Sequence, residues 1–184
     1  LFKQKLCKRI SAPYFSVNLR ILLLFQTMKI VLIVVGKTDP GWMQEGLDVY
    51  LQRLKFYTPF ELKIIPDPKN SGNLSQHDLK EKEWLKLATQ LKGKPDVFLL
   101  DERGQSCSSR ELAMLIERKM NQGCRELTFV IGGPFGFSPK TDELASGKIS
   151  LSRMTFSHQM ARLLLAEQLY RAFTIIRGES YHHD

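Results

Sequence analysis

The chain has 184 residues, 43% of them hydrophobic, so it can bury one sizeable core but is short for two domains of ordinary size. Its formal net charge of +8 invites a nucleic-acid partner. Five of the 27 Lys and Arg residues, and none of the 19 acidic residues, fall within residues 1–27, so the rest of the chain carries only +3. Charge alone therefore excludes a strongly basic body and identifies no partner.

Residues 1–27 show no sustained helical or strand periodicity before a clean apolar run begins at Met28. A secretory signal is the alternative, but its apolar core would span only residues 21–25, and Gln26-Thr27 is a poor cleavage site. We therefore expect residues 1–27 to be a non-native or disordered extension and residues 28–184 to form a single domain. No apolar run approaches the length of a membrane span.

The three cysteines, Cys7, Cys107 and Cys124, have no paired metal-ligand spacing, and their odd number argues against a complete disulfide framework. Two histidines at the end of the chain, with no carboxylate or cysteine cluster beside them, make a poor metal site. We expect a protein of the reducing cytoplasm without a bound metal.

The body of the chain alternates between apolar strand patterns and amphipathic helix patterns. Residues 29–35 are apolar on both faces, which indicates a central strand covered by helices. Strands are predicted at residues 29–35, 60–65, 96–100 and 126–131 and just before residue 157, and helices at residues 41–57, 75–91, 108–122 and 158–176. This alternation predicts an α/β fold with a mostly parallel sheet flanked by helices, whose ligand-binding loops follow Leu100, Ile131 and Leu151.

Two of these loops contain candidate binding residues. Asp101, Glu102, Arg103 and Gly104 follow an apolar strand, but a charged turn in this position is most often simply solvated. Residues 129–136 read Phe-Val-Ile-Gly-Gly-Pro-Phe-Gly, in which glycines permit positive φ and close approach of the backbone to a ligand. This run is neither a Walker loop nor a dinucleotide fingerprint, and a tight structural turn remains an equal alternative.

The third loop leads into the last predicted helix, for which Ser157 can serve as the N-cap. That helix has apolar residues around much of its circumference, more than a small core can cover, which indicates a subunit interface. Glu167 and Arg171, four residues apart, are expected to pair. A structural salt bridge is favoured for them over a contact with RNA.

Taken in order, several motifs resemble those of one family, the large-subunit ribosomal RNA pseudouridine N3-methyltransferases of the SPOUT class. They include Phe-Val-Ile-Gly-Gly-Pro-Phe-Gly, Leu-Ser-Arg-Met-Thr-Phe-Ser-His-Gln-Met-Ala-Arg, Glu-Gln-Leu-Tyr-Arg-Ala and Gly-Glu-Ser-Tyr-His-His. The resemblance runs from Met28 to Asp184. It implies a SPOUT fold with a C-terminal deep trefoil knot, an exception to the usual avoidance of knots, and a homodimer.

The resemblance also implies the chemistry and the site. The cofactor would be S-adenosylmethionine, and the reaction would be methylation of N3 of a pseudouridine in 23S ribosomal RNA, on the assembled 70S ribosome. In the tail, Tyr181 and His182 would orient the uracil ring or accept its proton. The implied cofactor-binding residues are Leu100, Gly132, Gly133, Leu151, Ser152, Arg153, Met154, Thr155 and Phe156. A SPOUT enzyme acting on another RNA and a non-catalytic ribosome-associated factor are the alternatives.

Overall fold

The computed structural model describes residues 28–182, so the expectation for residues 1–27 lies outside the described part of the chain. Its centre is a five-stranded sheet in the order β2-β1-β4-β3-β5 with every pair of neighbouring strands parallel. The elements are β1 (Lys29–Val35), α2 (Trp42–Leu54), β2 (Phe60–Ile65), η1 (Ser71–Asn73), α3 (Gln76–Leu91), β3 (Val97–Ser106), α4 (Ser109–Asn121), β4 (Glu126–Ile131), η2 (Pro139–Leu144), β5 (Gly147–Ser150) and α5 (His158–Arg177). The predicted α/β class and parallel sheet are confirmed.

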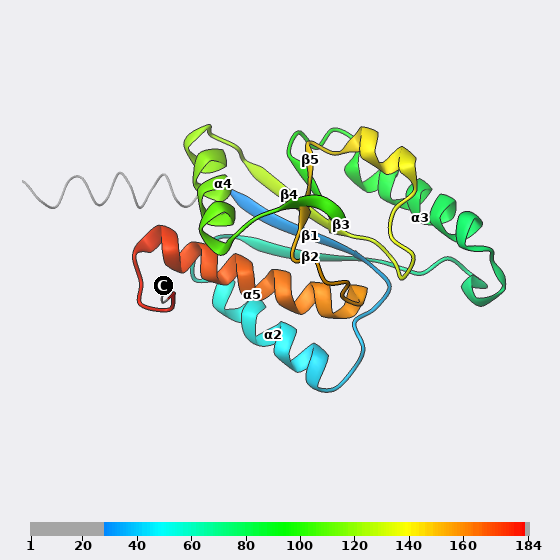
Figure 1. Ribbon diagram of the computed structural model, residues 1–184, viewed down its shortest axis with the longest axis horizontal. Helices are drawn as coiled ribbons and strands as arrows, with labels where there is room; N and C mark the ends of the chain where they lie inside the picture. The colour runs from blue at the N-terminus through cyan, green and yellow to red at the C-terminus, as the bar shows by residue number, and fades with distance from the viewer. Residues whose placement is uncertain (1–27, 183–184) are drawn as a thin grey trace, which may run out of the picture.

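Helices cover both faces of the sheet (Figure 1). Alternate residues of β1 point to opposite faces: Leu32 packs with α2, α4 and α5, whereas Ile33 packs with α3 and Phe137. Because both faces are buried, β1 and β4 are almost continuously apolar. Within residues 28–182, no helix is both long and apolar enough to cross a membrane.

The helix ends are set by local capping. Ser108 accepts a hydrogen bond from the Glu111 amide while the Glu111 side chain accepts one from the Ser108 amide, which forms a capping box at the start of α4. Ser157 accepts from the Met160 amide and begins α5, as predicted. This cap fixes the point where the segment after β5 turns into the helix.

The structure corrects one detail of the prediction. β3 does not end at Leu100 but continues to Ser106, so Asp101 to Gly104 belong to the strand rather than to a loop. Ile149 of β5 is the register partner of both Leu100 and Gln105, because the backbone of β3 bulges around it. The trefoil knot expected from the family resemblance stays a prediction.

Candidate functional site

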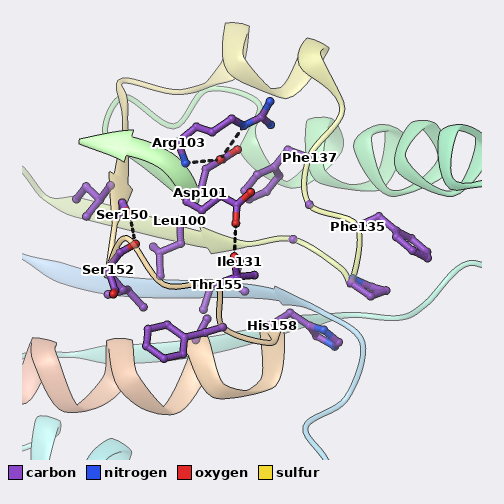
Figure 2. A pocket seen from close by; sticks show the side chains of 18 of the residues that line it. Leu100, Asp101, Arg103, Ile131, Phe135, Phe137, Ser150, Ser152, Thr155 and His158 are labelled. Carbon is purple, nitrogen blue, oxygen red and sulfur yellow. Dashed lines mark hydrogen bonds and ion pairs between the residues drawn. The ribbon is translucent and has the colours of Figure 1, made fainter. Parts of the chain in front are cut away.

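A cavity of about 270 Å³ opens at the carboxyl ends of β3, β4 and β5. This is where parallel sheets place their ligand sites. Figure 2 shows side chains from all three strand ends, from the glycine turn and from the start of α5 gathered around it. The residues that line it include Leu100, Asp101, Glu102, Arg103, Ile131, Gly132, Gly133, Phe135, Phe137, Ile149, Ser150, Leu151, Ser152, Met154, Thr155, Phe156 and His158.

The cavity brings together most of the residues that the sequence singled out for the cofactor. The predicted residues among its lining are Leu100, Gly132, Gly133, Leu151, Ser152, Met154, Thr155 and Phe156. Arg153 is exposed and is not among the lining residues. Segments that lie up to 56 positions apart in the sequence thus meet at one place, as the strand order requires.

The glycine turn after β4 is built differently from the prediction. Of its glycines only Gly136 has a positive φ, of 74°. A Cβ on Gly132 would lie 3.2 Å from Cε1 of Phe137, and a Cβ on Gly133 would lie 2.8 Å from Cδ of Glu83. Gly132 and Gly133 therefore lack side chains because Phe137 and Glu83 occupy the space behind the turn, and a strained backbone is not the reason.

The segment after β5 is held by short polar contacts. The Ser150 hydroxyl donates to the carbonyl oxygen of Ser152 at 2.7 Å, and the Ser152 hydroxyl oxygen accepts from the Met154 amide at 2.9 Å. The Thr155 hydroxyl donates to Oε2 of Glu102 at 2.9 Å, which joins this segment to β3 (Figure 2). Met154 is 72% exposed, so it offers an uncovered apolar surface beside the cavity.

Asp101 contributes a fixed negative charge within β3, directly after Leu100. Burial alone would raise the pKa of this carboxyl, but hydrogen bonds from the amide and the guanidinium of Arg103 outweigh burial and lower it. Asp101 therefore stays ionised, and Figure 2 shows its pairing with Arg103. From the sequence, this acidic segment was expected to be a solvated turn. The structure instead places it in the wall of the cavity.

His158 is a site residue for which the sequence suggested no role. It is the first residue of α5 and lines the cavity. Burial, and secondly the positive charge of Arg162, lowers the pKa of its imidazole, which keeps the ring neutral at neutral pH. In the sequence, His158 directly follows a predicted N-cap at the end of a ligand-binding loop, and this position could have identified it as a site residue.

Arg162, one turn further along α5, has no exposed surface. Its Nη1 donates to Oγ1 of Thr38 at 3.1 Å, and its Nη2 donates to the carbonyl oxygen of Val35. These bonds tie the start of α5 to the end of β1. The wall that carries His158 is therefore anchored to the centre of the sheet.

The tail residues lie away from this cavity. The Tyr181 hydroxyl donates to Oε1 of Glu167 at 3.1 Å, and its ring packs edge to face on Tyr170. Glu167 also forms the predicted pair with Arg171, at 2.6 Å. At 1.5 Å of rise per residue, Glu167 stands about 13 Å along α5 from His158. Figure 1 shows α5 running from its start after β5 to a far end that precedes the tail, and neither Tyr181 nor His182 lines the cavity of its own chain.

Tyr181 is poorly suited to accept a proton in this arrangement. Burial, followed by a hydrogen bond with Tyr50, raises the pKa of its hydroxyl well above the ordinary value of 10.0. The hydroxyl therefore stays protonated and acts as a donor. Within residues 28–182, no group of three or more His, Cys, Asp or Glu side chains is placed to hold a metal ion.

Comparison with known proteins places these features in a family. Residues 28–182 match a family model described as "Predicted SPOUT methyltransferase". A "Ribosomal RNA large subunit methyltransferase H" from Flavobacterium johnsoniae is 51% identical over 85% of this chain and 99% of its own length. Proteins with the same name from Porphyromonas gingivalis and Parabacteroides distasonis are 48% and 49% identical, each over 85% of this chain and 100% of its own length.

A solved structure agrees at the level of the fold. The crystal structure of a probable methyltransferase from Bordetella pertussis Tohama I superposes with a TM-score of 0.53 at 17% identity, covering 84% of this chain and 98% of that one. At this identity the likeness concerns the fold alone. Together with the family match over residues 28–182 and the relatives near 50% identity, it leads to one conclusion: this chain belongs to the SPOUT methyltransferase family.

Proposed function

We propose that this protein transfers a methyl group from S-adenosylmethionine to large-subunit ribosomal RNA, and that the acceptor is N3 of a pseudouridine in 23S RNA. The observation that carries the proposal is the cavity at the ends of β3, β4 and β5, which is lined by Leu100 and by residues of the two family motifs at 129–136 and 151–162. Relatives that are about half identical over nearly their whole length bear the name of a ribosomal RNA methyltransferase. Such a substrate would place the protein with ribosomes in the cytoplasm.

The residues of the cavity fit the cofactor. Gly132 and Gly133 line the cavity without side chains, so a ligand can approach the backbone there, and Leu151 and Ile131 offer apolar surface for a flat adenine ring. The segment 151–156 contributes both hydroxyls and the exposed Met154. Leu100, the glycine turn and this segment would hold the cofactor, with Arg153 facing solvent beside it. When bound, S-adenosylmethionine supplies a methyl group on a positively charged sulfur.

The acceptor nitrogen must lose a proton when it gains the methyl group. His158 lies in the cavity wall with a neutral imidazole, which can accept that proton at neutral pH. Tyr181 and His182 remain our proposal for orienting the uracil ring, with His182 as a second proton acceptor. The protonated hydroxyl of Tyr181 suits it to orientation, as a hydrogen-bond donor to a carbonyl oxygen of the base.

The position of the tail supports a homodimer. Met160, Leu163 and Leu164 of α5 are only half-buried although they are apolar, so the described residues leave part of this helix without a packing partner. A second copy that covers this face also supplies a second tail. We propose that Tyr181 and His182 of one protomer complete the cavity of its partner, because they lie too far from the cavity of their own chain.

The proposal is tested in a bacterium from which the corresponding gene has been deleted. Mass analysis of its 23S RNA is expected to show an unmethylated pseudouridine, and expression of residues 28–184 is expected to restore N3-methylation. Restoration of a methyl group at a different nucleotide would support the alternative RNA substrate. Calorimetry that detects no binding of S-adenosylmethionine to the folded protein would favour a non-catalytic ribosome-associated factor.

A further inference from the structure

Glu83 is a buried carboxylate that the mechanism above does not use. It lies on α3, is 4% exposed, and belongs to the buried stripe of that helix together with Leu79, Leu87 and Leu91. Its Oε2 accepts a hydrogen bond from the Gly133 amide at 3.3 Å. Among residues 28–182, no side-chain nitrogen of Lys, Arg or His lies within 4.0 Å of the Glu83 carboxyl oxygens, so none forms an ion pair with Glu83. The carboxyl group is thus held behind the glycine turn without a direct cationic partner.

Such an arrangement is unfavourable for the fold by itself. Transfer of a carboxylate out of water is costly, and one long hydrogen bond from a backbone amide offsets only part of that cost. A neutral glutamine of nearly the same shape would retain an acceptor for the Gly133 amide without the charge. A buried carboxyl beside a ligand cavity is therefore a candidate for a role in binding the ligand.

The electrostatic surroundings of Glu83 agree with this reading. Desolvation raises the pKa of its carboxyl, the Gly133 hydrogen bond lowers it, and the nearby charge of Asp67 raises it again. The positive charges of Lys86 and Lys80 on α3 lower the pKa of Glu83. The ammonium group of Lys86, however, already donates to the carbonyl oxygens of Pro66 and Asp67. A further positive charge near the turn would relieve this unfavourable balance.

The proposed cofactor brings such a charge. S-adenosylmethionine carries a sulfonium and an ammonium against one carboxylate, whereas its product, S-adenosylhomocysteine, has lost the sulfonium charge. We propose that Glu83 is a positioning residue of the cofactor site, whose carboxylate fixes the Gly132-Gly133 turn and favours binding of the cationic S-adenosylmethionine over its neutral product. This inference rests on the proposed function. The inference adds to the proposed function a reason why the product would leave the site more readily than the substrate.

Calorimetry on the full chain tests the inference with Glu83→Gln as the variant and Glu81→Gln as the matched control. Glu81 lies on the same helix, but its carboxylate contacts Ser138 and Lys140 instead of the glycine turn. For Glu83→Gln we expect the dissociation constant of S-adenosylmethionine to rise about three- to tenfold and that of S-adenosylhomocysteine to change less than about twofold. Glu81→Gln should leave both constants at the wild-type values.

Thermal unfolding without ligand separates this role from a merely structural one. Because glutamine avoids the burial of a charge, the midpoint of Glu83→Gln should equal or exceed that of the wild type. Equal loss of affinity for both compounds, or no loss for either, would overturn the inference while leaving the proposed function intact. A wild-type protein that binds neither compound would overturn the proposed function and this inference with it.

A second measurement follows the Glu83 carboxyl in the wild-type protein. Carbon NMR of the Glu83 carboxyl, assigned by its loss in Glu83→Gln, follows the titration of this group with and without ligand. By linkage, a ligand that prefers the ionised carboxylate must lower the pKa of the carboxyl. Saturation with S-adenosylmethionine should move the titration midpoint to lower pH, and S-adenosylhomocysteine should move it less. An unchanged midpoint with S-adenosylmethionine would refute the role assigned to Glu83.

Discussion

The guanidinium of Arg162 donates a hydrogen bond from Nη2 to the carbonyl oxygen of Val35, and the two atoms are 2.5 Å apart. Val35 is the last residue of the central strand β1, and Arg162 belongs to the first turns of α5. A second bond runs from Nη1 to Oγ1 of Thr38. The forked guanidinium thus joins the helix that carries His158 to the carboxyl end of the sheet.

We predict that Arg162→Lys destabilises the fold by about 1–3 kcal/mol, because a single ammonium does not reach both acceptors and leaves a buried oxygen without a donor. Urea unfolding measures the change, with Arg118→Lys on the exposed face of α4 as a control that should stay within about 0.5 kcal/mol of the wild type. Equal stability of Arg162→Lys and Arg118→Lys would show that the forked contact does not stabilise the fold.

The close approach of β3 and β5 gives a second prediction. A Cβ on Gly104 would lie 2.8 Å from backbone atoms of Lys148 and Ile149, which have no room to move within the sheet. Gly104→Ala should therefore lower the free energy of unfolding by about 1–3 kcal/mol. Gly72→Ala is the control, since no atom lies within 4 Å of the added Cβ there. A Gly104→Ala protein as stable as Gly72→Ala would contradict the pairing of β3 with β5.

The third prediction concerns pH. Burial and then Arg162 lower the pKa of His158 below its ordinary value of 6.5, so the unfolded chain binds this proton more readily than the folded one. The neutral imidazole of His158 therefore stabilises the fold fully above pH 6.5. This stabilisation is lost as the pH falls below 6.5 and through the lower pKa that His158 has in the folded protein. In His158→Asn, stability should depend less on pH between 5 and 6.5, as measured by urea unfolding at several pH values. An unchanged pH profile would argue against a buried neutral imidazole.

The proposed exchange of tails between protomers predicts complementation. Leu151→Arg fills the cavity but keeps the tail, and His182→Ala alters the tail but keeps the cavity. If the tail acts on the partner, a mixed dimer of the two variants has one intact site, and a refolded equimolar mixture should recover about a quarter of wild-type methylation. If the tail acts on its own chain, no site is intact. Methyl transfer by the mixture no higher than the mean of the separate variants would refute the exchange.

The sequence predicted the sheet well because its buried strands are continuously apolar and its helices carry clear caps such as Ser108 and Ser157. It did not predict that β3 continues to Ser106, because Asp101 to Ser106 have no apolar alternation and pair only through the distant β5. The burial of Glu83 was missed for a related reason. A charged residue in an amphipathic helix is normally assigned to solvent, and only the packing of α3 on the glycine turn buries it.

The candidate site was predictable to the extent that it lies at strand ends. Leu100 lies in β3, where its pairing with β4 ends, and Gly132 and Leu151 follow the neighbouring strands β4 and β5, so their meeting in one cavity follows from the parallel topology. The location of the tail was not predictable from sequence order. Tyr181 folds back against Glu167 and Tyr170, and its separation from the cavity is set by the length of α5.

Transfer of a labelled methyl group from S-adenosylmethionine to 70S ribosomes tests the central claim most directly. The wild type should place the label on N3 of a pseudouridine in 23S RNA, and Leu151→Arg should lower the transfer by about a hundredfold or more while remaining folded. Leu85→Arg makes the same change at a residue of α3 that is 58% exposed, and should act like the wild type. Absence of label from the RNA with wild-type protein, or transfer by Leu151→Arg as fast as by Leu85→Arg, would contradict the account.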